Sequence, residues 1–233
     1  MPTLFLAGID TGIGKSVAAG LLARHLLEQG QTVITQKLVQ TGCSGRPDDI
    51  LVHRRLMESG WLEEDESRLT CPYTFTFPGS PHLAARLDKA MIDPARITDA
   101  TRQLQAKFSW VILEGAGGLL VPLNDGLTLL DYISSREYPL VLVTSSRLGS
   151  INHTLMSLEI LKARKLHLAG LIYNIFAGGP DEIIQDSLRL FSRSLRHHGF
   201  PDNILVLPAW PHSRAMAWNR FLAPLDQPAA PAP

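Results

Sequence analysis

A lysine–serine pair follows a glycine-rich turn near the start of the chain, in the stretch GIDTGIGKSVA at residues 8–18. Gly12 and Gly14 allow the backbone to bring several N–H groups close to a polyphosphate. Lys15 can then reach the β- and γ-phosphates of a nucleotide, and the Ser16 hydroxyl can bind Mg²⁺. An ordinary tight turn with a solvated lysine is the alternative. These residue types predict a magnesium-dependent nucleotide site.

The spacing of this turn departs from the usual P-loop pattern. The pattern requires its first glycine at position 9, but Ile9 stands there and Gly8 comes one residue earlier. Partitioning ATPases similar to ParA and MinD carry a lysine five residues before the P-loop lysine, whereas this chain has Asp10 there. The loop is therefore a variant, and Asp10 argues against a partitioning ATPase.

Two further charged residues stand at the ends of predicted strands. Lys37 closes the run TVITQKL at residues 32–38, and Glu114 opens the stretch EGAGG after another apolar run. The carboxyl ends of parallel strands meet at one edge of a sheet, so both side chains should lie near the P-loop. Together with Ser16, Glu114 fits a magnesium ligand or a group that holds a metal-bound water. The alternatives are a snorkelling surface lysine and a helix-capping carboxylate.

The elements that must position these residues alternate along the chain. Apolar runs predict β-strands at residues 3–9, 32–38, 110–116, 139–145, 167–175 and 203–208. Several runs are apolar at consecutive positions, which is typical of strands covered on both faces. Helical spacing occupies residues 16–29, 93–107, 152–165 and 181–198. The alternation predicts an α/β fold: a parallel sheet flanked by helices, a three-layer sandwich like that of P-loop NTPases.

Composition limits the size and the partners of the protein. The chain has 233 residues, of which 45% are hydrophobic, enough for one core, so we expect a single nucleotide-binding domain at residues 1–221 and a disordered tail at 222–233. Residues 68–81 should form an irregular excursion because they carry several prolines. Lysine plus arginine and aspartate plus glutamate both total 22, which argues against nucleic-acid or membrane partners.

Cysteine content and hydropathy indicate the compartment. The chain has only two cysteines, Cys43 and Cys71, too few for a disulfide framework. No apolar stretch approaches the roughly 20 residues that span a bilayer, and no basic segment precedes the first apolar run. We therefore expect a cytoplasmic protein.

Four stretches in chain order, GIDTGIGKS, KLVQTG, EGAGG and LGSINHTL, together resemble the dethiobiotin synthetase family. The resemblance runs from Thr3 to about Trp210. It implies an ATP-dependent enzyme of biotin synthesis that joins 7,8-diaminononanoate and CO₂ into dethiobiotin, with ADP and phosphate as the other products. It also implies that the reaction passes through a carbamate and a carbamic–phosphoric anhydride.

The resemblance assigns roles to charged residues of this chain. Lys15 and Lys37 would be catalytic, because they would place positive charge around the carbamate and the transferred phosphoryl group. Ser16, Asp49 and Glu114 would hold Mg²⁺. Asp48 is the alternative to Asp49, and both could instead begin a helix.

The resemblance also implies two sets of binding residues. ATP and Mg²⁺ would contact Gly12, Ile13, Gly14, Lys15, Ser16, Val17, Asp49, Glu114, Gly115, Ala116, Gly117, Asn174, Pro208, Ala209 and Trp210. The diamine substrate would contact Thr11, Lys37, Thr41, Gly149, Ser150, Ile151 and Asn152. His82 lies in another stretch similar to the family and receives no role.

In the family, the other subunit of a dimer largely holds the substrate carboxylate, through the helix start in the segment that matches LGSINHTL. The resemblance thus implies a homodimer with composite active sites, although residues 150–152 could also act only as a helix cap.

Three other functions are alternatives: a ParA- or MinD-like regulatory or partitioning ATPase, a cobyrinic-acid-type amidotransferase, and a noncatalytic nucleotide-binding protein. The amidotransferase needs a glutaminase domain, which we do not expect in a chain of this length. The noncatalytic protein would leave the shared presence of Lys15, Lys37, Ser16 and Glu114 unexplained.

Overall fold

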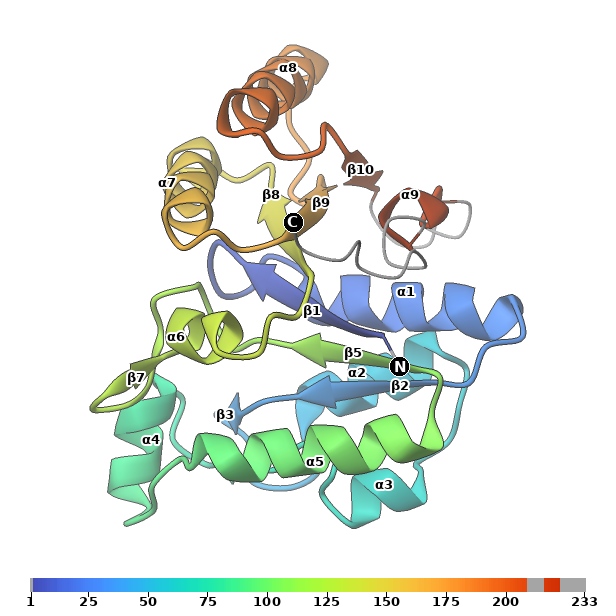
Figure 1. Ribbon diagram of the computed structural model, residues 1–233, viewed down its shortest axis with the longest axis vertical. Helices are drawn as coiled ribbons and strands as arrows, with labels where there is room; N and C mark the ends of the chain where they lie inside the picture. The colour runs from blue at the N-terminus through green and yellow to red at the C-terminus, as the bar shows by residue number, and fades with distance from the viewer. Residues whose placement is uncertain (1, 209–215, 223–233) are drawn as a thin grey trace, which may run out of the picture.

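A six-stranded parallel sheet forms the centre of the computed structural model, which describes residues 2–208 and 216–222 (Figure 1). Its strands are β1 (Thr3–Gly8), β2 (Val33–Lys37), β5 (Trp110–Glu114), β8 (Leu140–Ser145), β9 (Leu168–Asn174) and β10 (Ile204–Leu207). Their order across the sheet is β10-β9-β8-β1-β5-β2. All the strands predicted from apolar runs are confirmed, and so is the α/β class.

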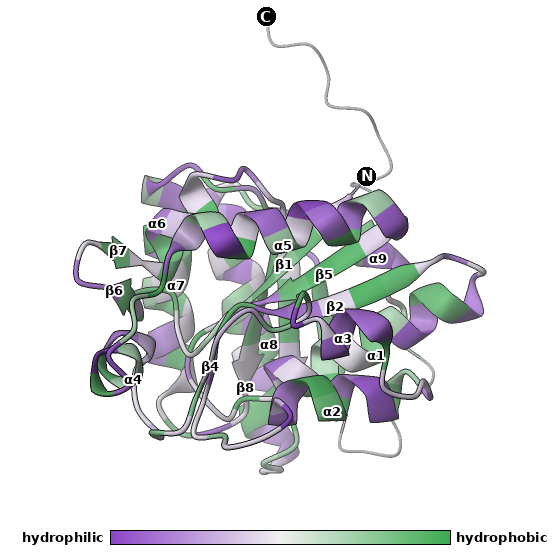
Figure 2. Ribbon diagram, turned by 90° about the horizontal axis from the view of Figure 1, so that it is seen from below, coloured by the Kyte–Doolittle hydropathy of each residue, from purple (hydrophilic) through white to green (hydrophobic). Residues whose placement is uncertain are grey.

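Helices cover both faces of this sheet. The four predicted helices are confirmed as α1 (Lys15–Glu28), α5 (Pro94–Lys107), α7 (Ser150–Ala163) and α8 (Asp181–His198). The structure adds α2 (Asp48–Leu56), α3 (Glu63–Glu66), α4 (Pro81–Leu87), α6 (Leu129–Ser134) and α9 (Asn219–Leu222). Figure 2 shows α5 on one face of the sheet and α1 with α2 on the other.

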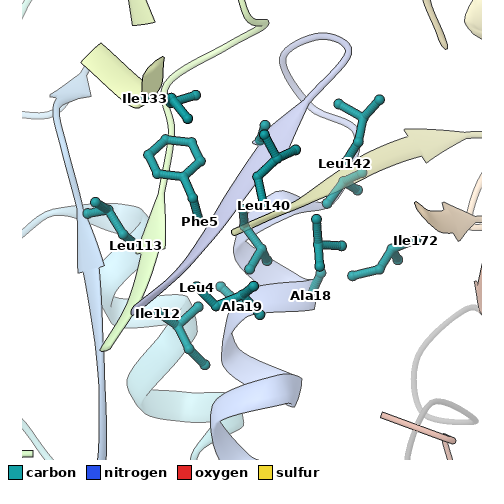
Figure 3. Close-up of a cluster of buried hydrophobic side chains, with 14 of the residues drawn as sticks. Leu4, Phe5, Ala18, Ala19, Ile112, Leu113, Ile133, Leu140, Leu142 and Ile172 are labelled. Atoms are coloured by element: carbon teal, nitrogen blue, oxygen red, sulfur yellow. The ribbon is translucent and has the colours of Figure 1, made fainter. Parts of the chain in front are cut away.

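The core lies between the sheet and these helices because neighbouring residues of a strand point to opposite faces. Leu4 of β1 lies beside Ile112 of β5 on the face covered by Ala19 of α1 (Figure 3). Phe5, the next residue of β1, lies on the other face, toward Ile133 of α6 (Figure 3). All five side chains are fully buried. Burial on both faces explains why β1 is apolar at successive positions.

Short elements that the sequence analysis did not predict complete the fold. They are a parallel pair, β3 (Gln40–Thr41) with β4 (Thr74–Phe75), and an antiparallel pair, β6 (Pro122–Asn124) with β7 (Leu127–Thr128). Apart from β4 and the start of α4, residues 68–81 are irregular, as predicted. Leu222, which the predicted tail included, is buried in α9, and residues 223–233 lie outside the described residues.

A close approach of two helices determines where α2 lies. Gly20 stands in the middle of α1, where a side-chain Cβ would come within 2.9 Å of Leu56 Cβ and 3.3 Å of His53 Cα. A glycine inside a helix normally costs about 1 kcal/mol relative to alanine. Here it lets α2 pack directly against α1, and this contact brings the side chains of α2 to the start of α1.

A buried ion pair also attaches α2 to its other neighbours in the fold. Arg54 donates from Nε and Nη2 to the two carboxylate oxygens of Asp65, at 2.8 and 2.7 Å. Its Nη1 donates to Thr35 Oγ1 of β2, and Thr70 Oγ1 donates to Asp65. Burial alone would raise the pKa of Asp65, but the Arg54 guanidinium outweighs this effect and the pKa is lowered. The network joins α2 to β2 and α3.

Among residues 2–208 and 216–222, no helix is both long enough and apolar enough to cross a bilayer.

Candidate functional site

A pocket of about 680 Å³ opens where β1, β2 and β5 end. Many of the residues that the sequence analysis assigned to the site line it: Thr11, Gly12, Gly14, Lys15, Ser16, Lys37, Thr41, Asp49, Glu114, Ala116 and Gly117. Pro78, in the loop between β4 and α4, and Pro81, the first residue of α4, also line it. The structure therefore brings the P-loop and both strand-end charges to one edge of the sheet, as predicted.

The turn between β1 and α1 takes a shape that requires glycine. Gly14 has φ of 92° and precedes the first residue of α1. A Cβ on it would come within 2.1 Å of Asn174 Nδ2, which donates to the carbonyl oxygen of Ile13 at 2.9 Å. The Asn174 side chain at the end of β9 therefore holds the turn in place. Gly14, Lys15 and Ser16, at the start of α1, line the pocket, and the free N–H groups of a helix start can bind an anion there.

Lys15 folds back over this turn. Its Nζ donates to the carbonyl oxygen of Asp10 at 2.5 Å, and its side chain passes over Gly8, where a Cβ would lie 2.8 Å from Lys15 Cδ. Gly8, displaced by one position from the usual pattern, thus leaves room for the lysine. Burial lowers the pKa of Lys15 to about 8, with a further contribution from the nearby positive charge of Lys37. A bound polyphosphate would offset both effects.

Ser16 lies between two carboxylates. Its Oγ is 2.8 Å from Asp49 Oδ1 and 2.9 Å from Glu114 Oε1. Asp48, the alternative, is exposed, although both aspartates belong to the first turn of α2 and neither caps it through a side-chain hydrogen bond. Asp49 is therefore the carboxylate that the fold brings into the cluster.

Lys37 joins the same cluster from the end of β2. Its Nζ lies 2.6 Å from Asp49 Oδ2, 2.8 Å from Glu114 Oε1 and 3.1 Å from the carbonyl oxygen of Gly115. Burial alone would lower the pKa of Lys37, but the two carboxylates outweigh it and the pKa is raised. The side chain is buried, so the interpretation as a snorkelling surface lysine was wrong.

Glu114 is the most deeply buried charge at this edge. Its Oε1 faces Ser16 and Lys37, and its Oε2 lies 2.8 Å from Nε2 of His53. Burial alone would raise the pKa of Glu114, but Lys37 and His53 lower it far below the usual range of a carboxyl group. Glu114 is therefore ionised at neutral pH, and it belongs to a charged cluster instead of capping a helix.

The oxygen donors of this cluster fit Mg²⁺. Within the described residues, no group of three or more His, Cys, Asp or Glu side chains is arranged to hold a metal ion by itself. Mg²⁺ commonly binds through one or two carboxylates together with phosphate oxygens and water. Asp49, Glu114 and the Ser16 hydroxyl, placed beside a phosphate-binding turn, match that donor set.

The predicted substrate contacts divide into two groups. Thr11 and Thr41 line the pocket, whereas Gly149, Ser150, Ile151 and Asn152 do not. Gly149, with φ of 90°, is the N-cap of α7 and has no side chain with which to cap it. The interpretation of residues 150–152 as a simple side-chain cap was therefore wrong. Leu148, next to this helix start, is fully exposed.

The remaining nucleotide contacts stay predictions. Ile13 and Gly115 are buried, and Val17 is half-buried on α1. Pro208 follows β10 and lines a separate pocket of about 320 Å³ together with Met216 and Arg220. Ala209 and Trp210 lie outside the described residues. His82, which received no role, lines a third pocket beside α4.

His53 is the main site residue that the sequence analysis missed. It stands four positions after Asp49, and residues at this spacing share one face of a helix. That spacing is the signal that could have identified it, but a helix beginning at Asp48 or Asp49 was only an alternative in the sequence analysis. Gln40 was also missed; its Oε1 accepts a hydrogen bond from the backbone N–H of Asp49 at 3.2 Å.

The sequence was compared with known families and curated proteins. The family described as AAA domain matches residues 2–198. The ATP-dependent dethiobiotin synthetase BioD 2 of Pasteurella multocida is 45% identical over 83% of this chain and 91% of its own length. The corresponding protein of Haemophilus influenzae is 50% identical over 73% and 90%, and BioD of Chlorobaculum tepidum is 47% identical over 84% and 82%.

Solved structures share the fold at much lower identity. A pNOB8 ParA bound to nonspecific DNA has a TM-score of 0.55 at 10% identity, covering 87% of this chain and 78% of its own. The receptor FtsY of Elizabethkingia anophelis, in complex with GDP, has a TM-score of 0.54 at 13% identity, covering 95% and 62%. These likenesses concern the fold alone.

Proposed function

The chain belongs to the family of ATP-dependent dethiobiotin synthetases, and on this premise we propose that it is a ligase of biotin synthesis that makes dethiobiotin from 7,8-diaminononanoate, CO₂ and ATP. The observation that carries the proposal is the cluster at the edge of the sheet. Lys15 and Lys37 bring two cations into one pocket, together with Ser16, Asp49 and Glu114. A ParA- or MinD-like role is supported only by the shared fold.

The proposed reaction has three steps, and each creates or transfers negative charge. An uncharged amine of the substrate adds to CO₂, loses a proton and becomes a carbamate. A carbamate oxygen then attacks the γ-phosphorus of ATP, and ADP leaves. The second amine, also uncharged, attacks the carbonyl carbon of the carbamic–phosphoric anhydride and loses a proton, and phosphate leaves as the ring closes. None of these steps needs a covalent bond to the protein.

The two lysines have different tasks in this sequence. Lys15, at the phosphate-binding turn, attracts the β- and γ-phosphates. Lys37 keeps its proton because Glu114 and Asp49 raise its pKa, so it is a fixed positive charge beside the carbamate and the anhydride. Preorganised charge of this kind stabilises anionic transition states. Thr11 and Thr41, which line the same pocket, would bind the reacting diamine end of the substrate.

Ser16, Asp49 and Glu114 are the residues that would hold Mg²⁺. When bound, the ion neutralises charge on the β- and γ-phosphate oxygens. The Ser16 hydroxyl already lies within 3 Å of an oxygen of each carboxylate. Asp49 and Glu114 also pair with Lys37, which keeps the two carboxylates at this spacing in the protein without nucleotide.

We further propose a homodimer in which the start of α7 of one subunit completes the pocket of the other. The substrate carboxylate needs a binding site, and the pocket of one subunit does not include residues 149–152. The backbone N–H groups at a helix start bind anions without a formal charge. The exposed Leu148 beside Gly149 supports an interface at this place.

The compartment and other partners follow from composition. Equal numbers of acidic and basic residues support a protein without a nucleic-acid or membrane partner. The free, buried thiols of Cys43 and Cys71 support a reducing cytoplasm.

Phosphate release tests the reaction. We expect release from ATP to require both the diamine and bicarbonate, because without a carbamate only water can accept the phosphoryl group. A Lys15→Gln protein, purified in parallel, measures contaminating ATPase activity. Equal release with and without the diamine would refute the synthetase, and stimulation by DNA or lipid vesicles alone would favour a regulatory ATPase.

Co-expression of two differently tagged variants tests the composite site. Lys37→Ala and Asn152→Glu should each be inactive as homodimers. The purified heterodimer should have about half the activity of the native dimer, because one of its two sites receives both intact halves. An inactive heterodimer, or an active monomer, would contradict the composite site.

A further inference from the structure

His53 lies behind the charged cluster, on the side away from the pocket. It belongs to α2, is fully buried and is absent from the residues that line the pocket. Its Nε2 lies 2.8 Å from Glu114 Oε2. Glu114 lines the pocket, so in the described part of the chain the Glu114 carboxylate links the ring of His53 to the pocket.

The two oxygens of Glu114 have separate surroundings. Oε1 faces Ser16 Oγ at 2.9 Å and Lys37 Nζ at 2.8 Å, on the pocket side. Oε2 faces His53 on the other side. Rotation of the carboxylate about its last side-chain bond would break these contacts together. His53 therefore fixes which oxygen of Glu114 is presented to the pocket.

The second ring nitrogen of His53 identifies the tautomer. Within the described residues, Nδ1 is buried and has no hydrogen-bond partner. An ionised carboxylate can only accept a hydrogen bond, so the proton between the two groups sits on Nε2 of His53. A buried N–H at Nδ1 without an acceptor would cost free energy. The contacts thus place a proton on Nε2, the ring nitrogen that faces Glu114.

One helix supplies both this contact and a direct site residue. Asp49 and His53 are four residues apart on α2, so they face the cluster from successive turns. The close packing of α2 on α1 at Gly20, where a Cβ would lie 3.3 Å from His53 Cα, brings both side chains within reach. Asp49 lines the pocket, and His53 contacts Glu114 without lining the pocket.

We propose that His53 is a positioning residue: its Nε2–H donates to Glu114 Oε2 and holds Oε1 toward Ser16, Lys37 and the metal-binding face of the pocket. The proposal rests on the proposed function only for the identity of the reaction. Hydrogen-bond partners of this kind orient a carboxylate ligand, and their loss typically weakens metal binding or activity by about 10- to 100-fold.

Two substitutions of similar size separate positioning from packing. His53→Gln retains an amide N–H that can reach Glu114, whereas His53→Leu fills the space without a donor. We expect His53→Leu to raise the Mg²⁺ concentration for half-maximal binding of a fluorescent ADP analogue by about 10- to 100-fold. His53→Gln should stay within about threefold of the native protein. Metal-free binding of the analogue should change little in either variant.

The binding assay distinguishes failure of this proposal from failure of the proposed reaction. Equal Mg²⁺ dependence of His53→Leu and His53→Gln would overturn the positioning role, whatever the enzyme's activity. The predicted difference, found in a protein without diamine-dependent phosphate release, would retain the role and refute the reaction. If His53→Leu does not fold, His53→Asn replaces it, because its shorter amide does not reach Oε2. Nitrogen-15 NMR of the native protein supplies a second readout, and a proton found on Nδ1 instead of Nε2 would also overturn the proposal.

Discussion

Replacing Lys37 with methionine should destabilise the protein as well as inactivate it. The side chain of Lys37 is only 6% exposed and that of Glu114 only 1%. Lys37 Nζ lies between two carboxylates, 2.8 Å from an oxygen of Glu114 and 2.6 Å from an oxygen of Asp49. Methionine keeps most of the volume but removes the charge. Among the described residues, Ser16 and His53 would remain as hydrogen-bond partners of Glu114, beside a second carboxylate.

The expected size of the effect follows from this burial. Removing one partner of a buried ion pair costs about 3–5 kcal/mol, because an uncompensated charge remains. For a domain of this length, each kcal/mol lowers the melting temperature by about 2–4 °C. Lys37→Met should therefore melt about 6–20 °C below the native protein. Diamine-dependent turnover should fall by about 100- to 1000-fold, the usual loss when one preorganised donor to a transition state is removed.

Urea unfolding of two further variants tests the reasoning. The double variant Lys37→Met/Glu114→Gln should be more stable than Lys37→Met alone, because it no longer buries an uncompensated carboxylate. Lys107→Met is the control, since Lys107 pairs with Glu64 at 2.9 Å on the surface, where solvent screens the pair and its loss should change stability little. If Lys37→Met unfolds at the native urea concentration, or the double variant is the less stable of the two, the electrostatic account is wrong.

Three other expectations follow from features described above. Gly20→Ala should lower the free energy of unfolding instead of raising it by the roughly 1 kcal/mol that helix propensity predicts, because its Cβ would meet Leu56; greater stability in urea would contradict the helix contact. Asp65→Asn should destabilise the protein at pH 7, but this difference should shrink below about pH 4. The sign follows because Arg54 lowers the pKa of Asp65 in the folded state, so the stabilisation is present above the unfolded-state pKa and is lost as the pH falls through the folded-state value. A pH-independent difference would refute the ion pair as its cause. Burial raises the pKa of Cys71 to about 11, so iodoacetamide at pH 8 should modify this thiol in urea but not in the native protein, as mass spectrometry of the peptide would show.

The central sheet could be predicted because its signal is local. Each strand is a short apolar run, and both faces of the sheet are covered, so the pattern does not depend on which strands become neighbours. The P-loop, Lys37 and Glu114 were predictable for a related reason. Strand ends of a parallel sheet meet at one edge whatever the order of the strands, and this rule brings the charges together.

Helix α2 and His53 were not predictable in the same way. Within DDILVHRRL, the polar residues His53 and Arg54 are buried, while Leu51 is exposed. Ile50 and Leu56 follow the usual pattern, but at these three positions burial is the reverse of the pattern on which helix prediction depends. The buried polar side chains are stable there only because Glu114 and Asp65, distant in sequence from α2 or separated from it by a loop, supply their partners. Such pairs become visible only after the chain is folded.

The order of strands in the sheet determines when the protein can fold during its synthesis. Thr3 of β1 pairs with Val111 of β5, and Phe5 pairs with Leu140 of β8. The first strand therefore waits for more than about 100 further residues before either neighbour exists, which takes roughly 5–20 s at ordinary rates of translation. During this time an apolar strand and the phosphate-binding turn behind it lack their hydrogen-bond partners. In a nascent chain released before β8 leaves the ribosome, at least one edge of β1 is unpaired. Premature termination should therefore yield aggregating fragments instead of a smaller nucleotide-binding protein.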